Sequence, residues 1–154
     1  MLESDLAKHF GQILSEYQIW IPNNRTAGWP DRGVQLKGSS SIVWAELKVL
    51  RMRLQSPMVL VSRLEPEQAA WLAKWQRQGG YCFLFLGFTG RSGELVEYGI
   101  LQRKDWTDWL KVPTHSIPLD QFLLFDQHDD ILKWFKVTFP LPGEKRLGDF
   151  RGCP

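Results

Sequence analysis

Several features that mark common protein classes are scarce in this 154-residue chain. Its two cysteines cannot supply a disulfide framework, so we expect a reduced, cytoplasmic protein. The longest mostly apolar stretch, residues 81–88, is less than half the length of a membrane span, so we expect no membrane partner. Residues 1–5 carry acids where a secretory signal peptide carries basic residues.

The chain also has no large excess of charge of one sign. Its 19 basic and 17 acidic side chains give a net charge of +2, which by itself does not indicate nucleic-acid binding. His9, His115 and His128 are far apart, and no cysteine pair has zinc-binding spacing, which argues against a zinc site. The serines at 39–41 have no nucleophile-elbow pattern around them and are typical of a turn.

The composition is that of an ordinary globular domain, with 44% hydrophobic and 23% charged residues. We predict one domain over residues 1–139, with its recognisable core at 3–101, followed by a Pro- and Gly-rich tail at 140–154. Eight of the twenty aromatic residues are tryptophans. Because indoles can fill a core or stack on bases, with the core the more common use, this count alone does not reveal a function.

Hydrophobic periodicity and turn residues predict a mixed α/β fold, with a mixed central sheet flanked by helices as in the restriction-endonuclease-like core. We expect strands at 33–37, 42–49, 81–88 and 95–101. Helices are expected at 3–16, capped by Ser4, at 66–78 and at 105–110. Residues 50–63 are expected to form a basic loop, 119–125 a helix, and 131–139 either a strand or a helix.

The strand at 42–49 is the most informative segment. Alternate side chains of a strand point to opposite faces, so Val43, Ala45 and Leu47 form an apolar face suited to a core. The other face begins apolar and ends in the opposite charges of Glu46 and Lys48. A charged end on one face only indicates a local function for these two residues.

Asp31 stands at the entrance of the preceding strand, where a tight hairpin would bring it near Glu46. Two carboxylates at close range repel each other, and a divalent cation between them relieves the repulsion. Oxygen ligands of this kind suit Mg²⁺, which commonly takes one or two carboxylates together with substrate phosphate. A nearby lysine could orient an attacking water and offset charge in the transition state. As isolated features, however, Pro-Asp is common in turns and Glu-x-Lys is usually a solvated ion pair.

Together these residues resemble a known signature. The stretch Gly28-Trp29-Pro30-Asp31, followed by Glu46-Leu47-Lys48, is similar to the PD-(D/E)xK nuclease motif. The helix that opens with Leu64-Glu65-Pro66-Glu67-Gln68 and stops at Gly79-Gly80 before an apolar strand is similar to that of the VRR-NUC branch, which lies near the archaeal-type Holliday junction resolvases and is common in phage. The resemblance covers residues 3–88. It implies a protein of the bacterial cytoplasm or, for a phage protein, of the cytoplasm of the host.

The resemblance implies a role for each matching residue. Asp31 and Glu46, with the backbone carbonyl of Leu47, would bind Mg²⁺, which Mn²⁺ could replace. Lys48 would position the attacking water, and Gln68, a polar residue in the apolar stripe of its helix, would steady the lysine or the water. An acid from the first helix would complete the site, with Glu3 as the first candidate and Glu16 as the alternative.

The implied function is a metal-dependent endonuclease that hydrolyses phosphodiester bonds in double-stranded or branched DNA and leaves 5′-phosphate ends. Basic side chains on both sides of the motif are candidates for DNA contacts: Arg25, Arg32, Arg51, Arg53, Arg63 and Lys74. A homodimer or a replication or recombination partner could direct the cutting. Two alternatives stay open: an inactive nuclease-fold module for DNA binding or assembly, and a Trp-rich domain that binds a ligand or a protein.

Overall fold

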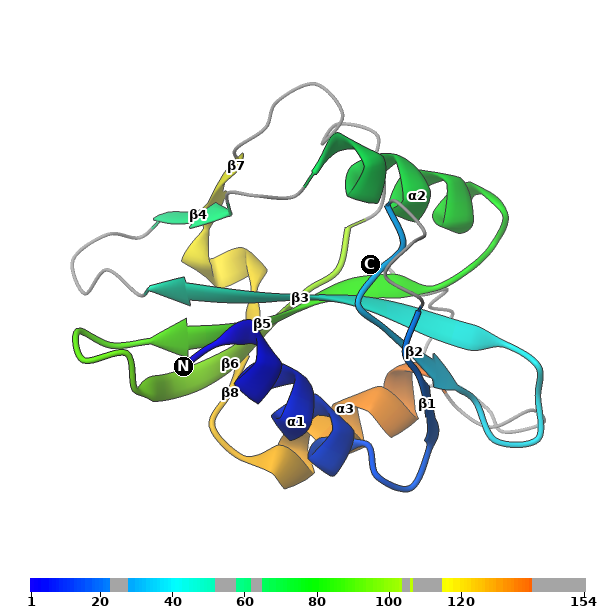
Figure 1. Ribbon diagram of the computed structural model, residues 1–154, viewed down its shortest axis with the longest axis horizontal. Coiled ribbons are helices and arrows are strands. Elements are labelled where there is room, and N and C mark those ends of the chain that lie inside the picture. Colours follow the sequence, from blue (N-terminus) through cyan, green and yellow to red (C-terminus); the bar gives the residue numbers. More distant parts are fainter. Residues whose placement is uncertain (23–27, 52–57, 62–64, 104–105, 107–114, 140–154) are drawn as a thin grey trace.

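A six-stranded mixed sheet forms the centre of the molecule and lies between helices (Figure 1). The computed structural model describes residues 1–22, 28–51, 58–61, 65–103, 106 and 115–139. Helices α1 (Glu3–Ile13) and α3 (His128–Thr138) pack on one face of the sheet, and α2 (Pro66–Arg77) packs on the other. The predicted mixed α/β architecture is therefore confirmed.

The sheet is antiparallel except at its centre. Across the sheet, the strands follow the order β1 (Gln18–Trp20), β2 (Arg32–Gln35), β3 (Ile42–Arg51), β5 (Cys82–Thr89), β6 (Leu95–Leu101) and β8 (Leu123–Phe125). β3 and β5 pair in parallel, and α2 lies in the connection between them, as a parallel pair requires. β4 (Met58–Val61) and β7 (His115–Pro118) form a separate antiparallel pair.

The two faces of β3 differ as the alternation predicts. Val43, Ala45 and Leu47 belong to the core beneath α1 and α3. Trp44 belongs to the core beneath α2, and Glu46 follows it on the same face at 0% exposure. This charged residue is thus enclosed between the sheet and α2.

Helix boundaries differ from the sequence prediction at the N-terminus and agree at α2. Leu2, and not Ser4, is the N-cap of α1, because the carboxylate of Asp5 accepts a hydrogen bond from the Leu2 N–H at 2.9 Å. The helix ends at Ile13, three residues before the predicted end. α2 begins at Pro66 as predicted and ends one residue early, before Gly79 with its φ of +86°.

The remaining differences involve strands whose partners are distant in sequence. β4 lies inside the segment predicted as a loop, and it pairs with β7. Residues 119–125 form a 3₁₀ turn, η2 (Leu119–Gln121), followed by β8, and not a helix. β1, which the sequence analysis did not predict, forms the edge of the sheet beside β2. Such pairings leave little local signal, since a three- or four-residue strand shows almost no periodicity.

The last predictions concern the C-terminal third of the chain, which the structure describes in part. The helix predicted at 105–110 lies outside the described residues apart from Trp106, and so does the tail at 140–154. The segment at 131–139, left open between strand and helix, is the helix α3 up to Thr138. In the part of the chain that the structure describes, no helix is long and apolar enough to cross a bilayer.

Candidate functional site

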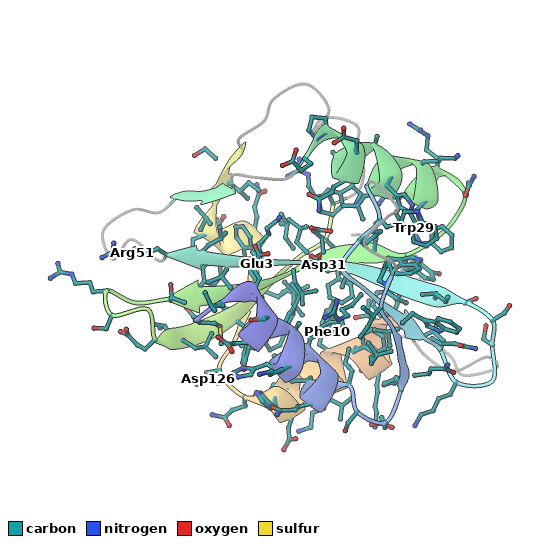
Figure 2. All side chains as sticks on the ribbon, in the orientation of Figure 1. Glu3, Phe10, Trp29, Asp31, Arg51 and Asp126 are labelled. Carbon is teal, nitrogen blue, oxygen red and sulfur yellow. The ribbon has the colours of Figure 1, made fainter. Side chains whose placement is uncertain are left out.

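The pairing of β2 with β3 determines where Asp31 lies. Arg32, the first residue of β2, pairs with Ala45, so the next position along sets Asp31 opposite Glu46. The N–H of Leu47 donates a hydrogen bond to Asp31 Oδ2 at 2.9 Å. Figure 2 shows Asp31 beside the middle of the sheet. A backbone donor on β3 thus holds this carboxylate against the strand that carries Glu46.

Glu46 has two polar side chains around one of its oxygens. Gln68 Nε2, from α2, donates a hydrogen bond to Glu46 Oε1 at 2.6 Å. Lys48 Nζ lies 3.6 Å from the same oxygen, and the lysine itself is 9% exposed. The second oxygen, Glu46 Oε2, is buried and meets no hydrogen-bond donor among the described residues. We call these four residues, Asp31, Glu46, Lys48 and Gln68, the acid site.

Burial and the neighbouring carboxylate change the acidity of Glu46. Burial raises the pKa of Glu46 to about 9, with a further increase from the neighbouring Asp31 carboxyl, while Lys48 acts in the opposite direction. At neutral pH the pair therefore retains one proton. Because a metal ligand must be deprotonated, a cation that binds here has to displace that proton.

The donor set fits a small hard cation. Two adjacent carboxylates, one with an oxygen that no described donor satisfies, suit Mg²⁺ or Mn²⁺, which commonly bind through one or two carboxylates and keep other positions for water and phosphate. In the described part of the chain, no group of three or more His, Cys, Asp and Glu side chains could hold a metal. The backbone beside this pair can supply a further oxygen ligand.

The backbone of Leu47 provides an oxygen in the appropriate direction. In an antiparallel ladder, the N–H and C=O of one residue point toward the same neighbouring strand. The N–H of Leu47 points to Asp31, so its carbonyl points to the same side, beyond the last β2–β3 pair at Arg32. The ladder with β2 leaves this carbonyl unpaired.

Helix α2 fixes the side chain of Gln68 by means of its own N-terminal cap. Gln68 Oε1 accepts a hydrogen bond from the backbone N–H of Glu65, the N-cap residue, at 3.0 Å. With its oxygen committed to this cap, the amide directs its nitrogen to Glu46. The motif implies that Gln68 steadies the lysine or the water, and in the structure its amide nitrogen donates to Glu46.

One residue that sequence reasoning did not assign to the site helps to position it. Gly28 has a φ of +82°, and a Cβ at this position would lie 2.7 Å from the backbone oxygen of Glu67. The segment that leads to Asp31 therefore passes directly against the first turn of α2. The signal in the sequence is a glycine three residues before the aspartate.

The predicted third acid does not join the pair. Glu3 is exposed in the first turn of α1, the helix on the face opposite α2 (Figure 2). Glu16 makes ion pairs with Lys37 at 2.7 Å and with Lys136 at 2.8 Å, and these lysines lower its pKa. Glu16 is therefore engaged away from the acid site.

The predicted DNA-contact residues are widely spread. The Arg32 guanidinium donates to the backbone oxygen of Asp31 at 2.6 Å. Arg51 is exposed at the end of β3, five residues or about 16 Å along the strand from Glu46. Lys74 is exposed on α2, on the same face of the sheet as the acid site. The other three predicted contacts, Arg25, Arg53 and Arg63, lie outside the described residues.

Comparisons with known proteins give a structural similarity and no sequence match. No protein-family model and no curated protein matches this chain. Its fold is similar to that of Hjc, a Holliday junction resolvase from the archaeal hyperthermophile Archaeoglobus fulgidus. This similarity has a TM-score of 0.47 at 13% sequence identity, over 84% of this chain and 96% of the resolvase chain. At that level it says nothing about activity, so a functional assignment depends on the side chains of the acid site.

Proposed function

We propose that this protein is a divalent-metal-dependent endonuclease that hydrolyses phosphodiester bonds in DNA and acts selectively on branched structures. One observation carries the proposal: Asp31 and Glu46, 15 residues apart in sequence, meet in the fold with Lys48 Nζ 3.6 Å from Glu46. Proximity of opposite charges alone would suit an ordinary ion pair. A carboxyl whose pKa is raised by burial and by a second carboxyl beside it is instead typical of a catalytic site.

Each residue has a separate role in the proposed reaction. Asp31, Glu46 and the Leu47 carbonyl would hold Mg²⁺ or Mn²⁺, which when bound lowers the pKa of water and polarises a phosphoryl oxygen. Gln68 and the Leu47 N–H keep the two carboxylates in place. Lys48 orients the attacking water, and its positive charge offsets the negative charge that develops on the phosphate.

Several finer features belong to this proposal and rest on the motif. Kinship with the PD-(D/E)xK superfamily, and within it with the VRR-NUC branch and with phage nucleases, rests on Asp31, Glu46, Lys48 and Gln68. Symmetrical cutting of a four-way junction would require a homodimer, and a replication or recombination protein could supply the targeting for other branched DNA.

A cleavage panel tests the proposal. Duplex, flap, splayed and four-way DNAs are incubated with the purified chain, with Mg²⁺, Mn²⁺ or chelator. We expect nicking that requires the metal and leaves 5′-phosphate ends. Asp31→Asn and Lys48→Ala should each lower the rate roughly 100-fold or more, because both residues act directly in the reaction.

A matched control separates catalysis from folding. Glu16→Gln removes an acid that is ion-paired away from the acid site, and it should cut at the parent rate. Parent-like cutting by Lys48→Ala would contradict the mechanism. Salt-sensitive DNA binding without cleavage of any substrate would instead favour the inactive module, and absence of both metal and DNA binding would favour the ligand- or protein-binding domain.

A further inference from the structure

Beside the acid site lies an apolar pocket of about 350 Å³ with an unusual lining. Five of its eight lining residues are tryptophans: Trp20, Trp29, Trp44, Trp71 and Trp75. Four of these indoles contact one another, with ring centroids 5.4–5.5 Å apart from Trp29 and Trp44 through Trp71 to Trp75. We call this feature the Trp pocket.

The Trp pocket is built by the same three chain segments that place the acid site. Each segment that places a polar residue of the acid site also carries an indole of the pocket two or three residues away: Trp29 with Asp31, Trp44 with Glu46, and Trp71 with Gln68. Two residues along a strand span about 7 Å on one face, and three along a helix about 4.5 Å. Because the rings of Trp29, Trp44 and Trp71 contact one another, all three indoles lie together beside the acid site.

The indoles are arranged as a binding surface and not only as a core. Trp29 is 40% exposed and Trp20 45% exposed, so the lining has an open side. A Cβ at Gly33 would lie 2.8 Å from the ring of Trp44, and one at Gly80 would lie 2.3 Å from the ring of Trp75. The ring of Trp75 is also held by a hydrogen bond from its Nε1 to the Tyr81 carbonyl at 3.1 Å. The chain thus makes room for these rings and fixes one of them.

The place of the Trp pocket beside the acid site indicates which ligand it binds. We propose that the Trp pocket binds one unstacked nucleobase of the strand whose phosphate lies at the acid site, an inference that rests on the proposed function. Indole faces stack on bases of any identity, but a base inside a duplex has both faces covered by its neighbours. A pocket of this kind therefore accepts only an unpaired base and favours forks, flaps and open junctions. Exposed Lys74, next to Trp75 on α2, supplies positive charge for the backbone of the same strand.

The fluorescent base 2-aminopurine, placed in turn at each unpaired position of a splayed DNA, tests this inference. Binding is measured with the Asp31→Asn protein, so that the DNA stays intact. Stacking in the Trp pocket should quench the fluorescence at one position, and an abasic site there should weaken binding about five-fold or more. Trp29→Leu and Trp20→Leu should each reduce the quenching, and Trp20 is far enough from Asp31 in sequence to leave the acid site in place.

A matched control replaces an indole outside the pocket. Trp134 lies on α3, against the core on the opposite face of the sheet, so Trp134→Phe should leave the quenching and affinity unchanged. Unchanged quenching in both Trp20→Leu and Trp29→Leu would overturn the inference. So would a loss of self-association in these variants with unchanged DNA binding, which would identify the pocket as a contact between two copies of this chain.

The same measurements separate this inference from the proposed function. If the parent cuts DNA in a metal-dependent way but shows no quenching at any position, the base pocket is refuted and the nuclease stands. If a position is quenched in a Trp-dependent way but no DNA is ever cut, the base pocket stands and the endonuclease is refuted.

Discussion

At the scale of single residues, Glu46 is the most unusual feature of the molecule. It is a carboxyl at 0% exposure, with one oxygen bound to Gln68 and the other without a donor among the described residues. Enclosing such a group without a full set of partners costs stability. This cost is consistent with the proposed function, in which a cation bound by Glu46 and Asp31 offsets it.

This cost makes the stability of the metal-free protein depend on pH. Between pH 4.5 and about 9 the folded chain keeps a proton on Glu46 that the unfolded chain has lost. The unfolded state therefore binds fewer protons, and the free energy of unfolding falls by about 1 kcal/mol per pH unit across this window. The contribution of Glu46 is fully present below pH 4.5 and is lost as the pH rises toward 9.

Glu46→Gln should remove that dependence. The amide keeps the oxygen that accepts from Gln68 but cannot ionise, so in chelator at pH 8 the variant should have a Tm several degrees above that of the parent. Near pH 4.5 the two values should converge. Added Mg²⁺ should raise the Tm of the parent and not that of E46Q, because the variant lacks the ligand. A lower Tm for E46Q at pH 8 in chelator would show that Glu46 stabilises the fold.

How much of the acid site follows from sequence depends on the kind of contact. Strand alternation placed Glu46 and Lys48 on one face, and the expected hairpin placed Asp31 beside them. Neither pattern could show that Glu46 is fully enclosed, because the cover comes from α2, which begins 20 residues later in the chain. The partner of Gln68 was equally hidden, since its choice depends on the cap at Glu65.

At the scale of elements, the close approach of the Asp31 segment to α2 can be tested through a glycine. Gly28→Ala would place a Cβ 2.7 Å from the Glu67 carbonyl and move either the Asp31 segment or the first turn of α2. We expect cleavage to fall at least ten-fold, because Asp31 and Gln68 would separate. Gly79→Ala is the control: its φ of +86° imposes a similar backbone penalty of about 1–2 kcal/mol, but nothing lies within 4 Å.

The comparison of the two variants isolates geometry from stability. Both should lose degrees in Tm, Gly28→Ala the more because of its added clash, while only Gly28→Ala should lose activity at temperatures where both variants are folded. Equal activity in the two variants would show that the contact between Gly28 and Glu67 does not position the site.

The elements themselves were predictable where their signal is local. α2, with Pro66 at its start and Gly79 after its end, was placed within one residue, and β6 was placed at its observed bounds. β1 and β4 were not predicted, because strands of three and four residues have almost no hydrophobic alternation of their own. They form by pairing with β2 and β7, respectively.

At the scale of the whole molecule, the two faces of the sheet differ in what they offer to DNA. The acid site, the Trp pocket and exposed Lys74 are on the side of α2. α2 carries one acid in its first turn, Glu67, and two basic residues in its last turn, Lys74 and Arg77, whereas α1 on the other side carries two first-turn acids, Glu3 and Asp5, and no basic residue in its last turn. Since phosphates repel acids, DNA should approach from the α2 side and leave the α3 side in solvent.

This orientation predicts different effects for two exposed lysines. Lys74→Ala, on α2, should weaken binding to all DNAs alike and lower the slope of log affinity against log salt by about 1, as the loss of one phosphate contact requires. Lys133→Ala, on α3, removes the same charge from the opposite face and should change neither quantity. Filter binding of Asp31→Asn forms of both variants at several salt concentrations measures the two slopes. Equal slopes in the two variants would contradict the predicted orientation, because Lys74 would then contribute no more to phosphate binding than Lys133. A reduced slope for Lys133→Ala alone would place the DNA on the α3 side, away from the acid site.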